Sequence, residues 1–492
     1  MFKRFFASFP LPVLPLMASS GEWNANPALY GPVEGAPVLM GSPPVSVLTD
    51  QGYVEQEFFL SGTARSYRGD LPENGRAIVQ QDKAAPYVTR LLVRRPADSA
   101  RFNGTVLMEW LNVTGGSDTA PVYSYAHRHL LRQGYAWVGV SAQRVGIEGG
   151  DGLAAYLPPL KKTDPQRYAQ LSHPGDAFSF DIFSQAGKVV AGLGGRAEPA
   201  PGLKAQRVIA VGESQSAHYL ITYLNALDPL HKIFDGALIM GRAASSAPIS
   251  GDVDLLNRSS DFYAQTVFIR TDVRVPVLEL DSETDVLQRG SMLARQPDSE
   301  HFKRWEIAGA AHADTYVLNA ASQDHAGIAP ARLAELTTPA CNVMGMALAA
   351  PINAGLQQHY ITQAAIHALD RWVRADGTPA HAAGLELNAE RSGFVLDEHG
   401  NARGGVRSPW VDVPTSVLSG LAQSGERFAM LFGSTAPFDT ARLKALYPNG
   451  VKDYLEQFTG ALDGAIAHGF ILAADREEII GVATASYPGI AQ

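Results

Sequence analysis

The chain has 492 residues and a formal net charge of −9, and 18% of its residues are charged. This length is enough to bury a sizeable core. The mild acidity, without any run of five basic residues, argues against a nucleic-acid partner. No run of about 18 apolar residues occurs, so no membrane span is expected. The single cysteine, Cys341, excludes an intrachain disulfide.

The first residues have some features of an export signal. Lys3 and Arg4 precede an apolar stretch over residues 5–17, which is followed by small residues. Three prolines within that stretch disfavour a helical signal. Residues 1–45 are therefore interpreted as an N-terminal arm or a signal peptide, and the location as cytoplasmic or exported.

Further along, apolar runs alternate with helical periodicity. The strands expected from apolar and β-branched runs are residues 53–60, 87–94, 105–111, 136–140, 207–211, 234–240, 275–280 and 302–307. The helices expected from the spacing of apolar residues are residues 122–132, 183–191, 215–225 and 357–373. This alternation predicts an α/β fold with a mostly parallel central sheet that is covered by helices on both faces.

Three long stretches interrupt the alternation, and loops of this length usually form roofs or small subdomains. They are residues 144–180, 241–272 and 313–356. After residue 378 the pattern changes to Gly- and Pro-rich turns followed by helix-like segments. We therefore expect a main domain over residues 46–378, which carries these insertions, and a C-terminal annex over residues 379–492 packed on its core.

The most informative motif is Gly212-Glu213-Ser214-Gln215-Ser216, which directly follows one expected strand and precedes a helix. This context is that of a nucleophile elbow, in which a tight turn exposes a serine Oγ above the strand ends. The backbone N–H of Gln215 would then point to where an oxyanion forms. The motif departs from the usual G-x-S-x-G at Ser216, and a serine that merely caps a helix is the alternative.

A serine needs a base, and His312 is the best-placed histidine, in a loop of small residues after the strand at 302–307. The acid should follow the strand at 275–280, where three carboxylates compete. Asp285 lies a few residues beyond the strand and is preferred, whereas Glu283 and Asp281 remain alternatives. The order of nucleophile, acid and histidine is that of α/β-hydrolases.

A second oxyanion donor is expected in the glycine-rich stretch after the strand at 105–111, with one N–H from Leu111, Asn112 or Val113 as the candidate. The sequence has no H-E-x-x-H, C-x-x-C or P-loop motif, and no G-x-G-x-x-G that opens a helix. No metal or cofactor is therefore expected.

Taken together, the motifs resemble those of the large, mostly bacterial family of α/β-hydrolase domain-containing proteins. The resemblance covers residues 45–488 and rests on GESQSA, MEWLNVTGG, LSHPGDAFSFDIFSQAG, SETDV, GAAHAD, GNARGGVRSPWVDVP and APFDTARLKALYPNGVKDYLEQF. It implies an α/β-hydrolase fold with a triad of Ser214, Asp285 and His312, and it makes Ser216 a family trait. It implies no substrate.

The expected function is a serine hydrolase of carboxylic esters that acts on a small molecule through an acyl-enzyme. Amide, lactone or thioester substrates would use the same groups. Alternatives are an acyltransferase, a lyase or another non-hydrolytic enzyme, and a non-catalytic binding protein on the same fold. The sequence carries no indication of the oligomeric state.

Overall fold

The computed structural model describes residues 27–151, 156–192, 203–251, 265–421, 423 and 428–488. The signal-like segment lies outside these residues. The strands of the central sheet are β1 (Ala28–Tyr30), β2 (Tyr53–Asp70), β3 (Ile78–Pro96), β4 (Thr105–Trp110), β5 (Ala136–Val140), β6 (Arg207–Glu213), β7 (Gly236–Met240), β8 (Val277–Ser282) and β9 (Phe302–Ile307). Their order is β1-β2-β3-β5-β4-β6-β7-β8-β9.

Strands β5, β4, β6, β7, β8 and β9 are parallel, whereas β1, β2 and β3 form an antiparallel edge. The larger helices of the main domain are α2 (Pro121–Gln133), α5 (Ser179–Val190), α6 (Gln215–Thr222) and α11 (Gln357–Val373). Since parallel strands need crossover connections, the helices fall on both faces of the sheet. The predicted α/β architecture is confirmed.

Alternate residues of the central strands build two separate cores, because side chains alternate across a strand. On β6, Ile209 and Val211 face the core that contains α2 and α11. Val208 and Ala210 face the core that contains α5 and α6. Buried on both faces, these strands are nearly continuous apolar runs, which is why the sequence pattern revealed them.

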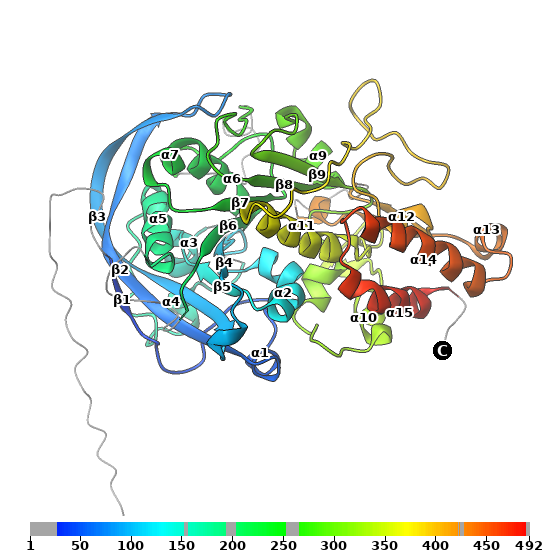
Figure 1. Cartoon of the computed structure of the whole chain (residues 1–492), viewed down its shortest axis with the longest axis horizontal. Helices are drawn as coiled ribbons and strands as arrows, with labels where there is room; N and C mark the ends of the chain where they lie inside the picture. The colour runs from blue at the N-terminus through cyan, green and yellow to red at the C-terminus, as the bar shows by residue number, and fades with distance from the viewer. Residues whose placement is uncertain are drawn as a thin grey trace, which may run out of the picture.

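The β2–β3 hairpin is longer than the sequence predicted. The two strands pair from Tyr53 with Pro96 to Asp70 with Ile78. The ribbon that they form curves along one side of the molecule (Figure 1). Its outer half, residues 61–70 and 78–86, has apolar residues interrupted by polar ones, so no continuous hydrophobic run marks it in the sequence. Part of the expected N-terminal arm also joins the sheet, because β1 pairs with β2.

The insertions contain short elements. They are α3 (Arg144–Glu148), α4 (Leu160–Thr163), α10 (Pro330–Leu336), β10 (Asn342–Val343) and β11 (Met346–Ala347). The insertion over 241–272 lies partly outside the described residues. Two short helices flank the sheet, α1 (Val45–Asp50) and α7 (Asp228–His231), and α9 (Glu283–Leu287) follows β8.

Residues 379–488 extend the edge of the sheet at β9. Val406 bridges Ile307 in parallel, and its N–H donates to the carbonyl of Glu306 at 2.6 Å. The elements of this segment are α12 (Pro409–Asp412), β12 (Ser416–Ser419), β13 (Ser434–Pro437), α13 (Thr440–Leu446), α14 (Val451–Ala467) and α15 (Arg476–Ser486). The last three helices lie at the end of the molecule opposite the β2–β3 ribbon (Figure 1).

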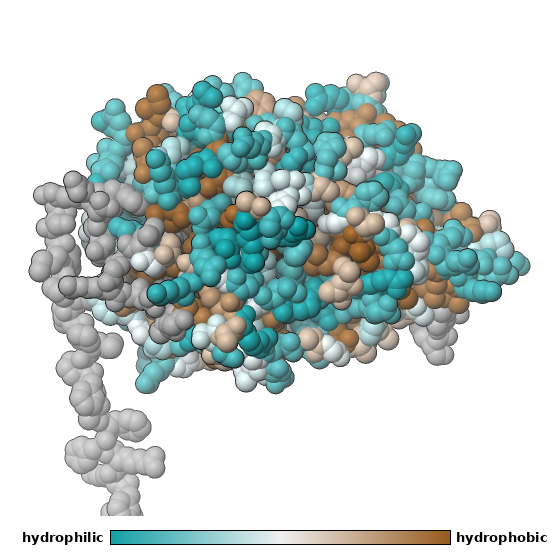
Figure 2. Space-filling model, in the orientation of Figure 1, coloured by the Kyte–Doolittle hydropathy of each residue, from teal (hydrophilic) through white to brown (hydrophobic). Residues whose placement is uncertain are grey.

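The surface mixes polar and apolar residues. On the face seen in Figure 2, the apolar residues lie in scattered patches among polar ones. Within the described ranges, no helix is both long and apolar enough to cross a membrane.

Candidate active site

Ser214 lies on a strained turn between β6 and α6. Its backbone has φ 58° and ψ −115°, a conformation that non-glycine residues rarely adopt. The Ser214 N–H donates to the carbonyl of Met240 on β7 at 2.9 Å, which holds the turn above the strand ends. Strain of this kind persists only where the surrounding structure enforces it, and here it presents the serine Oγ to the next loop.

The residues on either side of the turn are small because the chain folds back on itself. A Cβ added at Gly212 would lie 3.1 Å from the Cβ of Ser216 and 2.9 Å from a methyl of Leu220. Ser216 is completely buried against this glycine. A serine therefore fits the final position of the motif as long as position 212 has no side chain.

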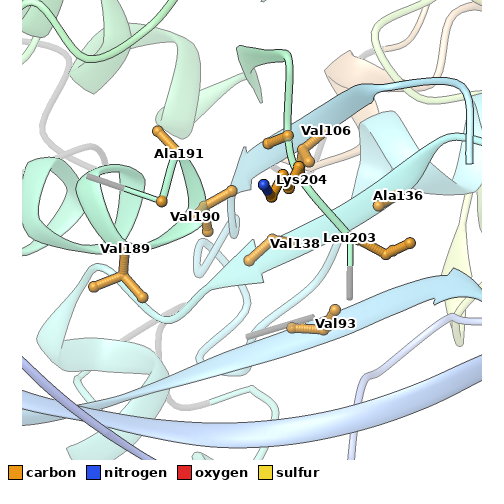
Figure 3. A pocket seen from close by; sticks show the side chains of 11 residues that line it. Val93, Val106, Ala136, Val138, Val189, Val190, Ala191, Leu203 and Lys204 are labelled. Atoms are coloured by element: carbon orange, nitrogen blue, oxygen red, sulfur yellow. The ribbon is translucent and has the colours of Figure 1, made fainter. Parts of the chain in front are cut away.

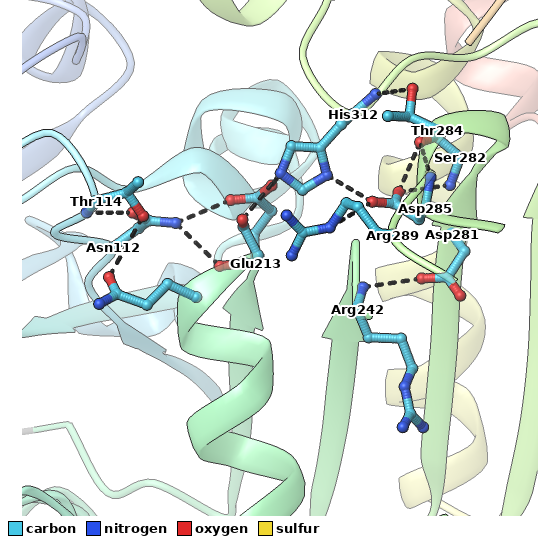
Figure 4. A network of polar contacts seen from close by, with 12 residues as sticks. Asn112, Thr114, Glu213, Arg242, Asp281, Ser282, Thr284, Asp285, Arg289 and His312 are labelled. Carbon is cyan, nitrogen blue, oxygen red and sulfur yellow. Dashed lines mark hydrogen bonds and ion pairs between the residues drawn. The ribbon is translucent and has the colours of Figure 1, made fainter. Parts of the chain in front are cut away.

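His312 links the serine to an acid. Its Nε2 lies 2.9 Å from Ser214 Oγ, and its Nδ1 lies 2.6 Å from Asp285 Oδ1. The backbone N–H of His312 donates to Thr284 Oγ1 at 3.1 Å, so the loop that carries Asp285 also positions the histidine loop. The structure thus joins Ser214, His312 and Asp285 in one hydrogen-bonded chain. Figure 4 shows the part between His312 and Asp285.

Asp285 is held by the local chemistry of a helix start. Ser282 caps α9 in a capping box, and its N–H and Oγ donate to Asp285 Oδ2 at 2.9 and 2.6 Å. The other oxygen, Oδ1, contacts His312 Nδ1 at 2.6 Å and Arg289 Nε at 3.2 Å. Burial alone would raise the pKa of Asp285, but the contact with His312 and the nearby Arg289 guanidinium lower it below its usual value. The carboxyl is therefore ionised at neutral pH.

The two alternative acids have other partners. Asp281 accepts the backbone N–H of Arg242 at 3.0 Å. Glu283 accepts the N–H of Gly309 at 2.6 Å and the N–H of Gly420 at 2.8 Å. Glu283 therefore links the loop after β8 (the acid loop, residues 281–286) to the loop after β9 (the histidine loop, residues 308–314) and to the C-terminal segment. Neither Asp281 nor Glu283 is bonded to His312.

The expected oxyanion donors differ in availability. The N–H of Leu111 donates to the carbonyl of Val140 at 3.2 Å, so it is not retained. The N–H of Asn112 already donates to the carbonyl of Thr119 at 2.9 Å, so this predicted donor is not retained. The N–H of Val113 also donates, but to a side chain that can change rotamer: its acceptor is Gln215 Oε1 at 3.3 Å. The N–H of Gln215 belongs to the first turn of α6, where backbone amides lack partners within the helix. Val113 and Gln215 are the remaining pair.

Glu213 is a neighbour of the histidine that the sequence analysis did not single out. Its Oε1 lies 3.1 Å from His312 Nε2, the same nitrogen that contacts Ser214. Asn112 Nδ2 donates to Glu213 Oε2 at 3.2 Å and to the Glu213 carbonyl at 3.1 Å. Figure 4 shows His312 between Glu213 on one side and Asp285 on the other.

Burial raises the pKa of Glu213 to about 7, although His312 and Arg289 act in the opposite direction. Arg289 was also not foreseen. It lies 3.2 Å from Asp285 Oδ1, one helical turn further along the chain, and 3.1 Å from His218 Nε2. The imidazole of His312 is therefore surrounded by two carboxyl groups and one guanidinium.

Gly241 provides the space in which His312 sits. It has φ +62°, and a Cβ added to it would lie 3.1 Å from His312 Cε1 and 3.2 Å from Nδ1. Its N–H donates to the carbonyl of Leu280. Because β7 ends at Met240, this glycine sits on the carboxyl edge of the sheet, directly beside the ring.

We expect Gly241→Ala to lower kcat by about tenfold, because the added methyl displaces the imidazole by less than the misplacement of about 1 Å that costs roughly 100-fold. The control is Gly469→Ala. This glycine has a similar φ, +79°, but open space around it, so the variant carries the backbone strain alone. Steady-state kinetics and melting temperatures separate the two effects. Equal kcat values for both variants would contradict the expectation.

A separate apolar cavity of about 230 Å³ lies between α5 and strands β3, β4 and β5 (Figure 3). Its walls are mainly valines and alanines, with Lys204 as the one charged residue. Gly192 and Leu203, which flank residues outside the described ranges, form part of its rim. It contains none of the candidate catalytic residues, so we assign it no part in this site.

Comparison with known families agrees with the fold. The model of a family described as "Alpha/beta hydrolase domain" matches residues 27–481. The chain is a member of this family. The match includes residues 212–216, 281–286 and 308–314 and most of the C-terminal segment, so the predicted resemblance is confirmed. Membership indicates a hydrolase and leaves the substrate open.

Solved structures of hydrolases are similar only at low identity. A cold-adapted esterase from an Arctic intertidal metagenomic library has 14% identity, covers 51% of this chain and 84% of its own, and gives a TM-score of 0.28. The acylaminoacyl peptidase of Pyrococcus horikoshii has 12% identity, 51% and 38% coverage, and a TM-score of 0.30. A serine hydrolase without a lid from Xanthomonas campestris has 12% identity, 49% and 84% coverage, and a TM-score of 0.26. No curated protein matches the chain significantly.

Proposed function

We propose that the chain is a serine hydrolase of carboxylic esters that works through an acyl-enzyme. The observation that supports this most is the chain of contacts from Ser214 Oγ to His312 Nε2 and from His312 Nδ1 to Asp285 Oδ1, at 2.9 and 2.6 Å. Each group lies within reach of the proton that it would move. The strained turn presents the serine as a nucleophile elbow does.

In the first half of the reaction, His312 Nε2 removes the proton of Ser214 as Oγ attacks the ester carbonyl. The N–H groups of Gln215 and Val113 bind the oxyanion of the tetrahedral intermediate. For this, the side chain of Gln215 must first move away from the N–H of Val113. Losing one such donor typically costs about 3–4 kcal/mol of transition-state stabilisation. The imidazolium then passes its proton to the departing alkoxide, which leaves as the alcohol.

In the second half, water takes the place of the alcohol. His312 removes a proton from water as it attacks the acyl-enzyme, and it returns that proton to Ser214 Oγ when the carboxylic acid leaves. Asp285 stays ionised throughout, orienting the imidazole and stabilising its charged form. The cycle uses side chains and backbone amides of this chain, and it requires no cofactor.

The test is the kinetics of p-nitrophenyl acetate, butyrate and octanoate with the full-length protein. We expect a burst of p-nitrophenol equal to the concentration of active sites where deacylation is the slower half, followed by steady turnover. Mass spectrometry after treatment with a fluorophosphonate should place one adduct on Ser214. The three esters also rank the preferred acyl length.

Different outcomes favour different alternatives. A fluorophosphonate adduct on Ser214 without ester turnover would favour an acyltransferase or a hydrolase with a narrow substrate range. The absence of both would favour a non-hydrolytic enzyme or a binding protein on the same fold. An adduct on another serine would contradict the assignment of the nucleophile.

A further inference from the structure

Two groups lie within hydrogen-bond distance of Nε2 of His312. Ser214 Oγ lies 2.9 Å from Nε2, and Glu213 Oε1 lies 3.1 Å from the same atom. A neutral imidazole that donates from Nδ1 to Asp285 has one lone pair on Nε2 and can accept one strong hydrogen bond there. A protonated Glu213 and the hydroxyl of Ser214 therefore compete for that lone pair.

The orientation of the Glu213 carboxyl leaves only one oxygen for this contact. Asn112 Nδ2 is a donor and contacts Oε2, so Oε2 acts as the acceptor. Any proton on the carboxyl then resides on Oε1 and points to His312. When Glu213 is ionised, Oε1 instead accepts a hydrogen bond from a protonated Nε2, which is the form that His312 takes during attack by Ser214.

Other titratable groups face Glu213 from the surrounding elements. They are His312 from the loop after β9, Asp285 and Arg289 from α9 and beyond, Glu109 from β4, and Tyr125 from α2. Of these, His312 is the one whose contact with the Glu213 carboxyl is within hydrogen-bond distance. Among these groups, Glu213 therefore competes with Ser214 for Nε2 through its direct contact with His312.

We propose that Glu213 is a second catalytic carboxyl group, which blocks Nε2 when protonated and stabilises the imidazolium when ionised, so that one proton shared by Glu213 and His312 switches the nucleophile off. This inference rests on the proposed function, because it concerns the activation of Ser214. Glu213 then acts beside Ser214, His312 and Asp285, and its ionisation makes the reaction faster as the pH rises.

The proton balance is simple. Below the switching pH, the pair holds one proton between Oε1 and Nε2, and Ser214 has no base. Above it, that proton has gone to solvent and Nε2 accepts the proton of Ser214. The resulting Nε2–H donates to Oε1 until the leaving alkoxide removes it. Burial raises the pKa of Glu213 to about 7, so activity is expected to increase as pH rises through neutrality.

The experiment compares the wild type with Glu213→Met and Glu213→Gln over pH 5 to 9. Methionine has a similar length and no donor or acceptor at that position. Glutamine places its carbonyl on Asn112 and its amide N–H on Nε2, so it mimics the protonated carboxyl at every pH. Two readouts are used: kcat/KM on p-nitrophenyl butyrate, and the rate at which a fluorophosphonate labels Ser214.

For Glu213→Met we expect the profile to cross that of the wild type. At pH 8 and above, the variant is about tenfold slower, because the imidazolium has lost a charged hydrogen-bond partner. At pH 5.5 it is faster, since nothing competes with Ser214, and the midpoint of the acid limb moves down by about 1 to 3 pH units. Glu213→Gln is slow throughout and gains nothing at pH 5.5.

Asp314→Asn is the matched control. Asp314 is also buried, and burial raises its pKa to about 7, but its carboxyl accepts from Tyr125 and Val317 rather than from His312. Its acid limb should keep the wild-type midpoint. An equal shift in this control would assign the effect to the general field of buried carboxyls and overturn the proposal.

The proposal is also overturned if Glu213→Met and Glu213→Gln lose activity by the same factor at every pH, which is the result of a purely structural role. This failure differs from failure of the proposed function. If the wild type labels at Ser214 but no crossover occurs, only the role of Glu213 is wrong. If the wild type neither turns over esters nor labels, the hydrolase proposal fails, and this one fails with it.

Discussion

Replacing Ser214 by alanine is expected to abolish the burst and to lower kcat on p-nitrophenyl butyrate roughly a million-fold, the effect of removing the nucleophile from a serine triad. The variant keeps His312 and the oxyanion donors, so it retains substrate binding but cannot form an ester on the protein. Burst kinetics and intact-mass spectrometry measure the loss of the acyl-enzyme directly.

The control is Ser216→Ala, which removes a buried hydroxyl two residues away. Ser216 packs against Gly212, and its Oγ makes no hydrogen bond with the described residues, so the kcat of this variant should stay near that of the wild type. Melting temperatures establish that both variants are folded. Ester turnover that survives in Ser214→Ala, or that disappears in Ser216→Ala alone, would refute the assignment of Ser214.

The second large effect is expected from Asp285→Asn, which should lower kcat about 10⁴-fold, as in other serine triads. The donors of Ser282 require an oxygen at the position of Oδ2, so the new amide nitrogen faces His312. Its N–H then binds Nδ1 and places the ring proton on Nε2. In that tautomer His312 cannot accept the proton of Ser214.

The measurement is kcat/KM for Asp285→Asn beside Asp281→Asn and Glu283→Gln, the two other acids of that loop. Neither of these carboxylates is bonded to His312, so we expect much smaller losses of kcat in both variants. Denaturation curves account for any loss of stability in Glu283→Gln, since Glu283 holds two backbone amides. A larger effect on kcat at Asp281 or Glu283 than at Asp285 would contradict the choice of acid.

Much of this architecture was predictable because the central strands are buried on both faces. Their apolar runs and the following helices gave the α/β class, and chain order suggested Ser214, Asp285 and His312. One further signal was present but unused. Ser282 and Asp285 have the spacing of a capping box, which favours Asp285 over Glu283 and Asp281 as the residue that is fixed in place.

Other features depend on tertiary contacts that have no local pattern. Glu213 reads in sequence as the variable position of the elbow, and only the packing of the histidine loop brings it to Nε2. Gly241 is one of many glycines until the ring beside it is known. The N–H of Asn112 was a reasonable donor in sequence, but a bridge to Thr119 already uses it. The outer half of the β2–β3 ribbon mixes apolar and polar residues without a continuous apolar run, so it gives no clear strand signal.

The contacts of Thr284 have a consequence for protein synthesis. Its Oγ1 accepts the backbone N–H of His312 and donates to the carbonyl of Gly420 at 2.6 Å. Gly420 therefore supports the histidine loop through Thr284. It leaves the ribosome long after Ser214, Asp285 and His312. A nascent chain that ends before residue 420 carries all three groups without the contact that completes their frame. The histidine loop therefore gains its full set of contacts only after synthesis has passed residue 420.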